Sequence, residues 1–280
     1  MLEHAAPDSK PLFGVQDVWV GAIDLSLDGD AALLDQLLAR HAEQGTPSTE
    51  VSFCLGLPHD ADVRSLKVAI AKHPRIRLFS VSDGADRSTA AALAQGRSLL
   101  SRLISQGYPI DDACARLQFR LHLSDDLFHE VARLRAFREA WAAVVDEFKP
   151  EHDCSHTTWV QAVVSYPAET KSAHENLIRA TLQTVSAITG GCDGLTITTP
   201  TLPKNDALAR RVVRNIHNLL RDESFLGRVA DPIGGSCTVE QLTSTLVKAL
   251  TERESAAQPA ASGQKPVASS QQPAAGIPNR

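Results

Sequence analysis

The stretch ARLQFRLHLSDDLFHEVARLRAFREAWAAVVDEF, residues 115–148, combines a strand pattern and a helix pattern in one unit. Its first nine residues are short and rich in apolar side chains, which predicts a strand over 115–123. Ser124 is the N-cap candidate, and the acidic Asp125 and Asp126 favour a first helical turn. Apolar side chains then recur at i, i+3/i+4 spacing and predict one buried helical face, made of Leu127, Val131, Leu134, Phe137, Trp141, Val144 and Phe148.

The same unit recurs along the chain. Further strand-like runs occupy 18–27, 49–57, 75–82, 157–165, 194–199 and 228–230, and helical spacing separates them. Strand then helix, about seven times over, indicates parallel strands joined by helical crossovers. We therefore predict an α/β fold of the (β/α) TIM-type barrel class, truncated at the N-terminus to about seven recognisable strands. An open doubly wound sheet is the alternative.

Composition limits the classes of protein to consider. The chain has 280 residues, of which 43% are hydrophobic and 22% charged, with a net charge of −5. A mild acidic excess without a Lys/Arg cluster argues against nucleic-acid and anionic-membrane partners. Five widely spaced cysteines without a C-x-x-C pair form no disulfide framework, which suits a reducing cytosol. No signal peptide or run of about 18 apolar residues is present, so we expect a cytoplasmic protein.

The sequence also predicts how the chain divides. Residues 1–12 are expected to be a flexible N-terminus, and residues 13–252 the barrel domain. Residues 253–280 consist mainly of Ala, Gln, Pro, Ser and Gly, with too little apolar surface to offset the entropy of ordering. We expect a disordered tail there.

Side chains that follow the strands are the candidates for chemistry, because the loops after parallel strands build the site of a barrel. An aspartate in such a place is more often the cap of the next helix than a catalytic group. No base stands obviously paired with a nucleophile, and no basic anchor is evident. The candidates are Asp28, Asp30, His59, Asp60, Asp83, Asp86, His122, Ser124, Ser165, Tyr166, Thr198 and Thr199.

The stretch EHDCSH, residues 151–156, places two histidines and a cysteine at alternate positions. Imidazole and thiolate are natural zinc ligands. However, the sequence shows no fourth ligand, and the stretch precedes a strand, at the barrel end opposite the expected chemistry. We interpret it as a polar loop.

The stretch RVADPIGGSCTVEQLT, residues 228–243, reads as a strand, a glycine-rich turn and a helix start. Free backbone N–H groups at such a helix start suit an anion or another ligand oxygen. Glycines also permit close packing of a helix on a strand, so spacing alone leaves both interpretations open.

Four blocks in family order resemble the methylmalonyl-CoA mutases. DESFLGRVADPIGGSCTVEQLT resembles the family's EES-x-x-x-RVxDPxGGSYYVExLT, and residues 115–148 resemble its RLxF strand and KLRAxRxxWA helix. Residues 175–199 are similar to a further helix and strand of the family, and residues 205–221 to another of its helices. The RFRL-like second block is nearest the non-catalytic small subunit. By position, the resemblance implies these candidates for cofactor contacts: Asp231, Gly234, Gly235, Ser236 and Glu240.

Other family features have no counterpart. The N-terminal segment with the active-site tyrosine is missing, and the position of the family's catalytic histidine falls on Val160. Valine cannot donate a hydrogen bond or a proton. No D-x-H-x-x-G occurs, so the cobalt-binding module is not found, and SCTVE stands where the family has SYYVE. The resemblance therefore implies no catalytic or metal-binding residue in this chain.

What the resemblance implies for function is a small-subunit-like, catalytically silent barrel that pairs with a mutase large subunit or a separate cobalamin-binding subunit. Adenosylcobalamin would then act through the partner, not through this chain alone, and acyl-CoA is the associated ligand. Two alternatives remain. In the first, the chain is the substrate barrel of a split adenosylcobalamin-dependent acyl-CoA mutase. In the second, it is a cobalamin-independent barrel enzyme that uses Asp and His at the strand ends.

Overall fold

The computed structural model describes residues 24–29, 32–84, 86–165, 173–198 and 206–257. Strands and helices alternate through most of this range, as the sequence predicts. The strands are β1 (Leu25–Ser26), β2 (Phe53–Cys54), β3 (Ile76–Arg77), β4 (Phe79–Ser82), β5 (Leu117–His122), β6 (Trp159–Val164) and β7 (Gly194–Ile197). The helices are α1 (Ala32–Glu43), α2 (Leu66–Ile70), α3 (Thr89–Ser105), α4 (Ile110–Ala115), α5 (Leu127–Asp146), α6 (Ala173–Thr189), α7 (Asp206–Asn218) and α8 (Cys237–Ala257).

All strand pairs are parallel, and neighbours in the sheets are neighbours in sequence. One sheet has the order β1-β2-β3 and the other β4-β5-β6-β7. Leu78 joins them, because its carbonyl accepts from Leu57 at 2.9 Å and its N–H donates to Arg116 at 2.8 Å. A doubly wound sheet reverses its strand order, and no reversal occurs among the described strands. This sequential order favours the barrel-type arrangement.

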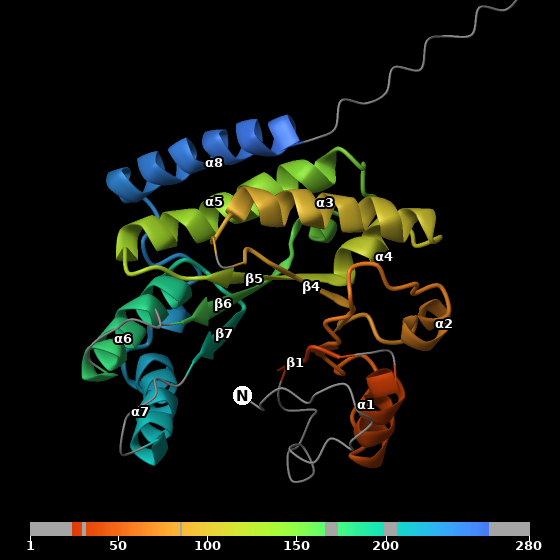
Figure 1. Ribbon diagram of the computed structural model, residues 1–280, viewed down its shortest axis with the longest axis horizontal. Coiled ribbons are helices and arrows are strands. Elements are labelled where there is room, and N and C mark those ends of the chain that lie inside the picture. The colour runs from red at the N-terminus through yellow and green to blue at the C-terminus, as the bar shows by residue number, and fades with distance from the viewer. Residues whose placement is uncertain (1–23, 30–31, 85, 166–172, 199–205, 258–280) are drawn as a thin grey trace, which may run out of the picture.

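The sheet curves into an arch with the helices on its outside (Figure 1). β4 and β5 lie at the middle of the arch, and β1 and β7 lie at its two ends. Within the described residues β1 and β7 do not pair with each other. The α/β class with parallel strands is confirmed, and closure of the barrel stays a prediction.

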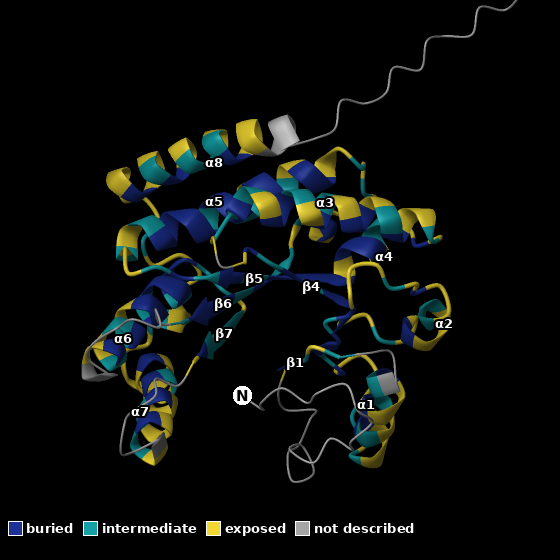
Figure 2. Cartoon of the chain, viewed as in Figure 1, coloured by how far each residue is buried: buried dark blue, intermediate teal, exposed yellow. Residues whose placement is uncertain are grey.

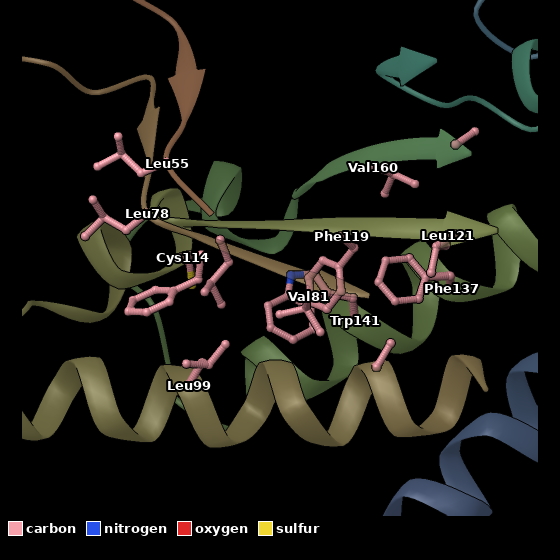
Figure 3. Packing of buried hydrophobic residues seen from close by; sticks show 14 of the residues in the cluster. Leu55, Leu78, Val81, Leu99, Cys114, Phe119, Leu121, Phe137, Trp141 and Val160 are labelled. Carbon is pink, nitrogen blue, oxygen red and sulfur yellow. The ribbon is translucent and has the colours of Figure 1, made fainter. Parts of the chain in front are cut away.

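The outer face of the sheet packs on helices α3 and α5 and forms the core. Phe119 of β5 meets the rings of Phe137 and Trp141 on α5, with centroids 4.8 and 4.7 Å apart. Val160 of β6 joins the same cluster (Figure 3). Helix α8 then crosses α5 and α3 as a further layer, which is why α5 is buried along much of its length (Figure 2). The predicted apolar face of residues 127–148 is therefore confirmed.

Two local predictions are wrong. The run 228–230 is no strand: Leu226–Arg228 form a 3-10 turn, and Val229 lies in an exposed bend. Three residues without a neighbouring strand cannot satisfy their backbone groups in a ladder. The N-cap of α5 is Asp126 instead of Ser124, since the Asp126 carboxylate accepts the N–H of His129 at 3.1 Å. Ser124 binds Glu130 instead.

The structure also bears on the predicted end of the helix before Gly190-Gly191 and on the predicted flexible termini. Gly191, with φ of 79°, follows the end of α6 and has the left-handed conformation expected of a C-cap. The predicted flexible residues 1–12 lie outside the described residues, as do residues 258–280 of the predicted tail. The predicted start of the tail at residue 253 is wrong, because α8 continues to Ala257. None of the described helices combines the length and apolar character that crossing a membrane requires.

Candidate functional site

The inner face of the arch, defined as the face opposite Phe119, is polar. Alternation along β5 directs Gln118, Arg120 and His122 to this face, because successive strand residues point to opposite sides. Gln118 donates to the Ser26 hydroxyl at 2.8 Å, and Arg120 donates to Asp28 at 3.2 Å. Both partners belong to the β1 end of the arch, so these side chains reach across its interior.

At the carboxyl ends of β4 and β5, Asp83 and His122 come together. The ring nitrogen Nδ1 of His122 lies 2.7 Å from Asp83 Oδ1, and the backbone N–H of His122 donates to the same carboxylate at 3.1 Å. A carboxylate accepts hydrogen bonds, so this contact fits a ring whose Nδ1–H donates to Asp83, and in the neutral form of that tautomer the lone pair lies on Nε2. The His122 side chain is 26% exposed and the Asp83 side chain is fully buried.

Arg133 on α5 neutralises this buried carboxylate. Its Nη1 donates to Asp83 at 3.2 Å and to the Thr89 hydroxyl at 3.0 Å. Its Nη2 lies 2.6 Å from Glu130, which is also buried. One buried arginine thus pairs with two buried carboxylates, and such charges are tolerated inside a protein only when they are paired in this way.

Of the remaining candidates at the strand ends, Ser124 joins this cluster, because its hydroxyl donates to Glu130 at 2.7 Å; the others lie apart from it. His59 and Asp60 lie with Arg102 at a separate shallow cavity of about 260 Å³. Asp86 and Thr198 are exposed, and Ser165 is half-buried. Asp30, Tyr166 and Thr199 lie outside the described residues.

Thiol chemistry is not supported at the buried cysteines. Burial raises the pKa of Cys54, Cys114 and Cys192 to about 12 in each case. Their thiols therefore stay protonated at neutral pH and are poor nucleophiles.

The stretch 151–156 forms a single 3-10 turn, Asp153–His156, immediately before β6. Its position at the amino end of the strand agrees with the sequence interpretation. His156 lies near Asp146 rather than with the other potential ligands. Within the described part of the chain, no three His, Cys, Asp or Glu side chains gather as a metal site.

The loop 231–236 is held to α5 by Arg135. This guanidinium lies 2.5 Å from Asp231 and 2.7 Å from Glu240. Burial acts to lower the pKa of Arg135, but the two carboxylates outweigh it and raise that pKa above its ordinary value. Glu240 also accepts the N–H of Gly235 at 3.1 Å, and Glu240 N–H donates to the Ser236 carbonyl. We call Arg135, Asp231 and Glu240 the arginine clasp.

The clasp lies on the helical side of the sheet, near the amino end of β7. Asp231 and Arg135 line an open cavity of about 380 Å³ together with Gly191 and Asp193, which immediately precede β7. The prediction that 231–236 is a strand-to-helix loop at the carboxyl edge is therefore wrong, because no strand precedes it. Gly234, Gly235 and Ser236 are exposed turn residues here.

Val160 occupies the middle of the apolar core and is 1% exposed. Its neighbour Gln161 faces the polar inner side and donates to Thr196 at 2.7 Å. Val160 and the inner-face groups therefore lie on opposite sides of the sheet.

Sequence reasoning named Asp83 and His122 but missed Arg120, Arg133, Gln118 and Gln161. The sequence does contain a signal for the inner-face residues of β5. Polar residues at every second position of QFRLH mark a strand with one polar face. The position of Arg133 on a helix facing Asp83 depends on packing, which no local pattern reports.

Comparisons with known proteins give a consistent result. The family described as "Methylmalonyl-CoA mutase" matches residues 82–256. The methylmalonyl-CoA mutase small subunit of Propionibacterium freudenreichii subsp. shermanii is 36% identical over 168 residues, covering 57% of this chain and 26% of that protein. The small subunit of Streptomyces virginiae is 35% identical over 264 residues, covering 83% of this chain and 42% of that protein.

A protein named methylmalonyl-CoA mutase, from Rhizobium meliloti (strain 1021), is 31% identical over 166 residues, covering 57% of this chain and 23% of that protein. The chain thus spans less than half of the length of each of these relatives.

Proposed function

Since the chain belongs to the methylmalonyl-CoA mutase family, we propose that it is a small-subunit-like member that performs no mutase chemistry and pairs with a cobalamin-dependent acyl-CoA mutase subunit. The names of the relatives from Propionibacterium and Streptomyces support the small-subunit assignment. A small subunit implies a larger one, so the partner in this proposal is a mutase large subunit. A separate cobalamin-binding subunit is the other form that such a partner could take.

The proposed lack of mutase chemistry rests on the side chain at position 160, which is a valine. The resemblance places the family's catalytic histidine at this position, where the chain has an apolar side chain buried in the core. An isopropyl group between the sheet and α5 can neither donate nor accept a proton. On this basis the chain supplies structure to a complex rather than a proton-transfer group for rearrangement.

The residues present do not fit adenosylcobalamin. Among those carried over by resemblance, Asp231 and Glu240 are already neutralised by Arg135. Gly234, Gly235 and Ser236 form an exposed turn between Asp231 and Glu240, which Arg135 holds to the helix layer. Any role of the cofactor in this proposal therefore belongs to the partner.

Co-purification with the mutase large subunit from the same genome tests the proposal. We expect the two chains to elute together, and we expect methylmalonyl-CoA mutase activity with adenosylcobalamin only when the large subunit is present. If this chain elutes alone while the mutase runs normally without it, pairing is rejected. Turnover of methylmalonyl-CoA by this chain with a cobalamin-binding subunit alone would instead favour the split mutase.

A second candidate, a cobalamin-independent barrel enzyme, is favoured by one arrangement. Asp83 orients His122 so that Nε2 is available as a base at the carboxyl edge of the strands. This candidate predicts a protein that is stable alone and turns over a substrate in a screen of esters and carbon acids. Replacing His122 by Gln should abolish that turnover. Stability only in complex with a mutase subunit would count against it.

A further inference from the structure

Two polar atoms on the inner face are buried and have no hydrogen-bond partner among the described residues. They are Nε of Arg120, a donor, and Oε1 of Gln161, an acceptor. An orphaned buried polar atom costs about 1–3 kcal/mol, so native proteins rarely leave such atoms unused. A donor and an acceptor left open side by side suggest a place for a ligand.

Register places the two residues next to each other on neighbouring strands. Arg120 and Gln161 are direct partners in the parallel ladder of β5 and β6, and their side chains lie on the same face. His122 follows Arg120 by two residues on that face, one step nearer the carboxyl edge. Within the described chain its Nε2 has no partner, because Asp83 takes only Nδ1.

The guanidinium of Arg120 is used on one side only. Its Nη1 contacts Asp28 at 3.2 and 3.3 Å, which is long for a charge-assisted hydrogen bond. The opposite edge carries Nε and Nη2, and its buried Nε has no acceptor among the described residues. Two parallel N–H groups along that edge match the two oxygens of a carboxylate.

We propose that Arg120, Gln161 and His122 form a binding site for a small carboxylate that also carries a hydroxyl group. The carboxylate accepts from the Nε/Nη2 edge of Arg120. The hydroxyl donates to one of the two open acceptors, Gln161 Oε1 or His122 Nε2. A ligand of this class satisfies the buried donor and a neighbouring acceptor together. This site goes beyond the proposed pairing and needs no partner subunit.

Titration of the full chain with glycolate, followed by NMR of the histidine rings, tests the site. We expect the His122 ring signals to move with saturation, since glycolate carries both groups. Acetate lacks the hydroxyl and glycolamide lacks the charge, so both should bind more weakly. Arg120→Gln should raise the Kd for glycolate about 10- to 100-fold, the range for hydrogen bonds to a charged group.

Two variants make the outcome decisive. Arg64→Gln, at an exposed arginine paired with Asp62, should leave glycolate binding unchanged. Gln161→Leu removes an acceptor without altering charge, and it should reduce the preference for glycolate over acetate even if Arg120→Gln fails to fold. Equal Kd values for glycolate in wild type and in a folded Arg120→Gln variant would overturn the site, as would binding that leaves the His122 signals unmoved. Neither result bears on co-purification with a mutase.

Discussion

Asp83 gathers groups from two other parts of the chain: the ring and backbone of His122 at the end of β5, and Arg133 on α5. A fully buried carboxylate is unfavourable unless partners of opposite charge and hydrogen-bond donors replace the lost water. All of these partners are supplied here within 3.2 Å. At the scale of single residues, this position therefore couples the strand ends to the helix layer.

Asp83→Asn is expected to lower the free energy of unfolding by about 2–4 kcal/mol, because it leaves Arg133 with one buried carboxylate instead of two. Urea unfolding followed by circular dichroism measures this change. Asp62→Asn, at an exposed pair with Arg64, is the matched control and should leave the urea midpoint unchanged. Equal midpoints for both variants would contradict the role given to Asp83.

His41 makes stability depend on pH. It is 1% exposed, stacks on Phe53, and neither ring nitrogen has a hydrogen-bond partner among the described residues. Burial, with a smaller effect of His73, lowers the pKa of His41 below 6.5. The unfolded chain then binds the proton more readily, so stability is full above pH 6.5 and is lost as the pH falls through the window between 6.5 and the folded pKa.

His41→Phe should flatten this pH dependence, because phenylalanine cannot be protonated and keeps the stacked ring. Free energies of unfolding in urea at pH 7.5 and 5.5 measure the effect. We expect a smaller drop at pH 5.5 in the variant than in the wild type. If both proteins lose the same stability, another group is responsible for the slope.

At the scale of elements, α3 approaches the sheet closely at Gly96. A Cβ built there would lie 2.6 Å from both the Phe119 and the Trp141 rings, well inside contact distance. Gly96→Ala is therefore expected to destabilise by about 1–3 kcal/mol, despite the better helix propensity of alanine. Gly227, with open space around it, is the control. A thermal melt of Gly96→Ala that matches Gly227→Ala would disprove the close approach.

The arginine clasp holds the start of α8 to α5. Arg135→Ala removes both ion pairs, and since Asp231 and Glu240 are about half exposed, the loss should be modest, about 1 kcal/mol. Hydrogen exchange is the more direct measurement: amides at 234–240 should exchange faster in the variant. Lys248→Ala, at an exposed site on the same helix, should leave them unchanged. Unchanged exchange in Arg135→Ala would show that packing alone holds α8.

At the scale of the whole molecule, several large apolar side chains remain uncovered. Ile178 and Leu182, one turn apart on α6, are 66% and 48% exposed, and Phe225 and Val229 are exposed near η5 (Leu226–Arg228), which packs on α6. Uncovered apolar surface of this kind is typical of protein–protein contacts. If pairing with a mutase subunit is correct, this side of α6 is where we expect it.

Replacing both Ile178 and Leu182 by Ser should weaken co-purification with the mutase large subunit at least tenfold, because the variant loses apolar area without touching the core. Binding measured by surface immobilisation of the large subunit gives the ratio. Val68→Ser, exposed on α2, is the matched control. An unchanged affinity in the double variant would move the contact to another surface.

Local periodicity accounts for what sequence reasoning predicted well. The strand over 115–123 and the helix after it were placed to within a few residues, because alternation and i, i+3/i+4 spacing are properties of the segment itself. The same local signals failed at 228–230, where an apolar run has no neighbouring strand to pair with. Asp83 and His122 were named as candidates, but nothing local showed that they touch.

The sequence by itself determined the α/β class, the order of the elements and the family, since all three depend on patterns along the chain. Only the tertiary structure decided which polar groups meet. It joined Asp83, His122 and Arg133 from separate elements, and it turned the 231–240 segment toward Arg135 instead of the inner face. The physical reason is that contacts between residues 39 or more positions apart depend on strand register and helix packing, which no single segment encodes.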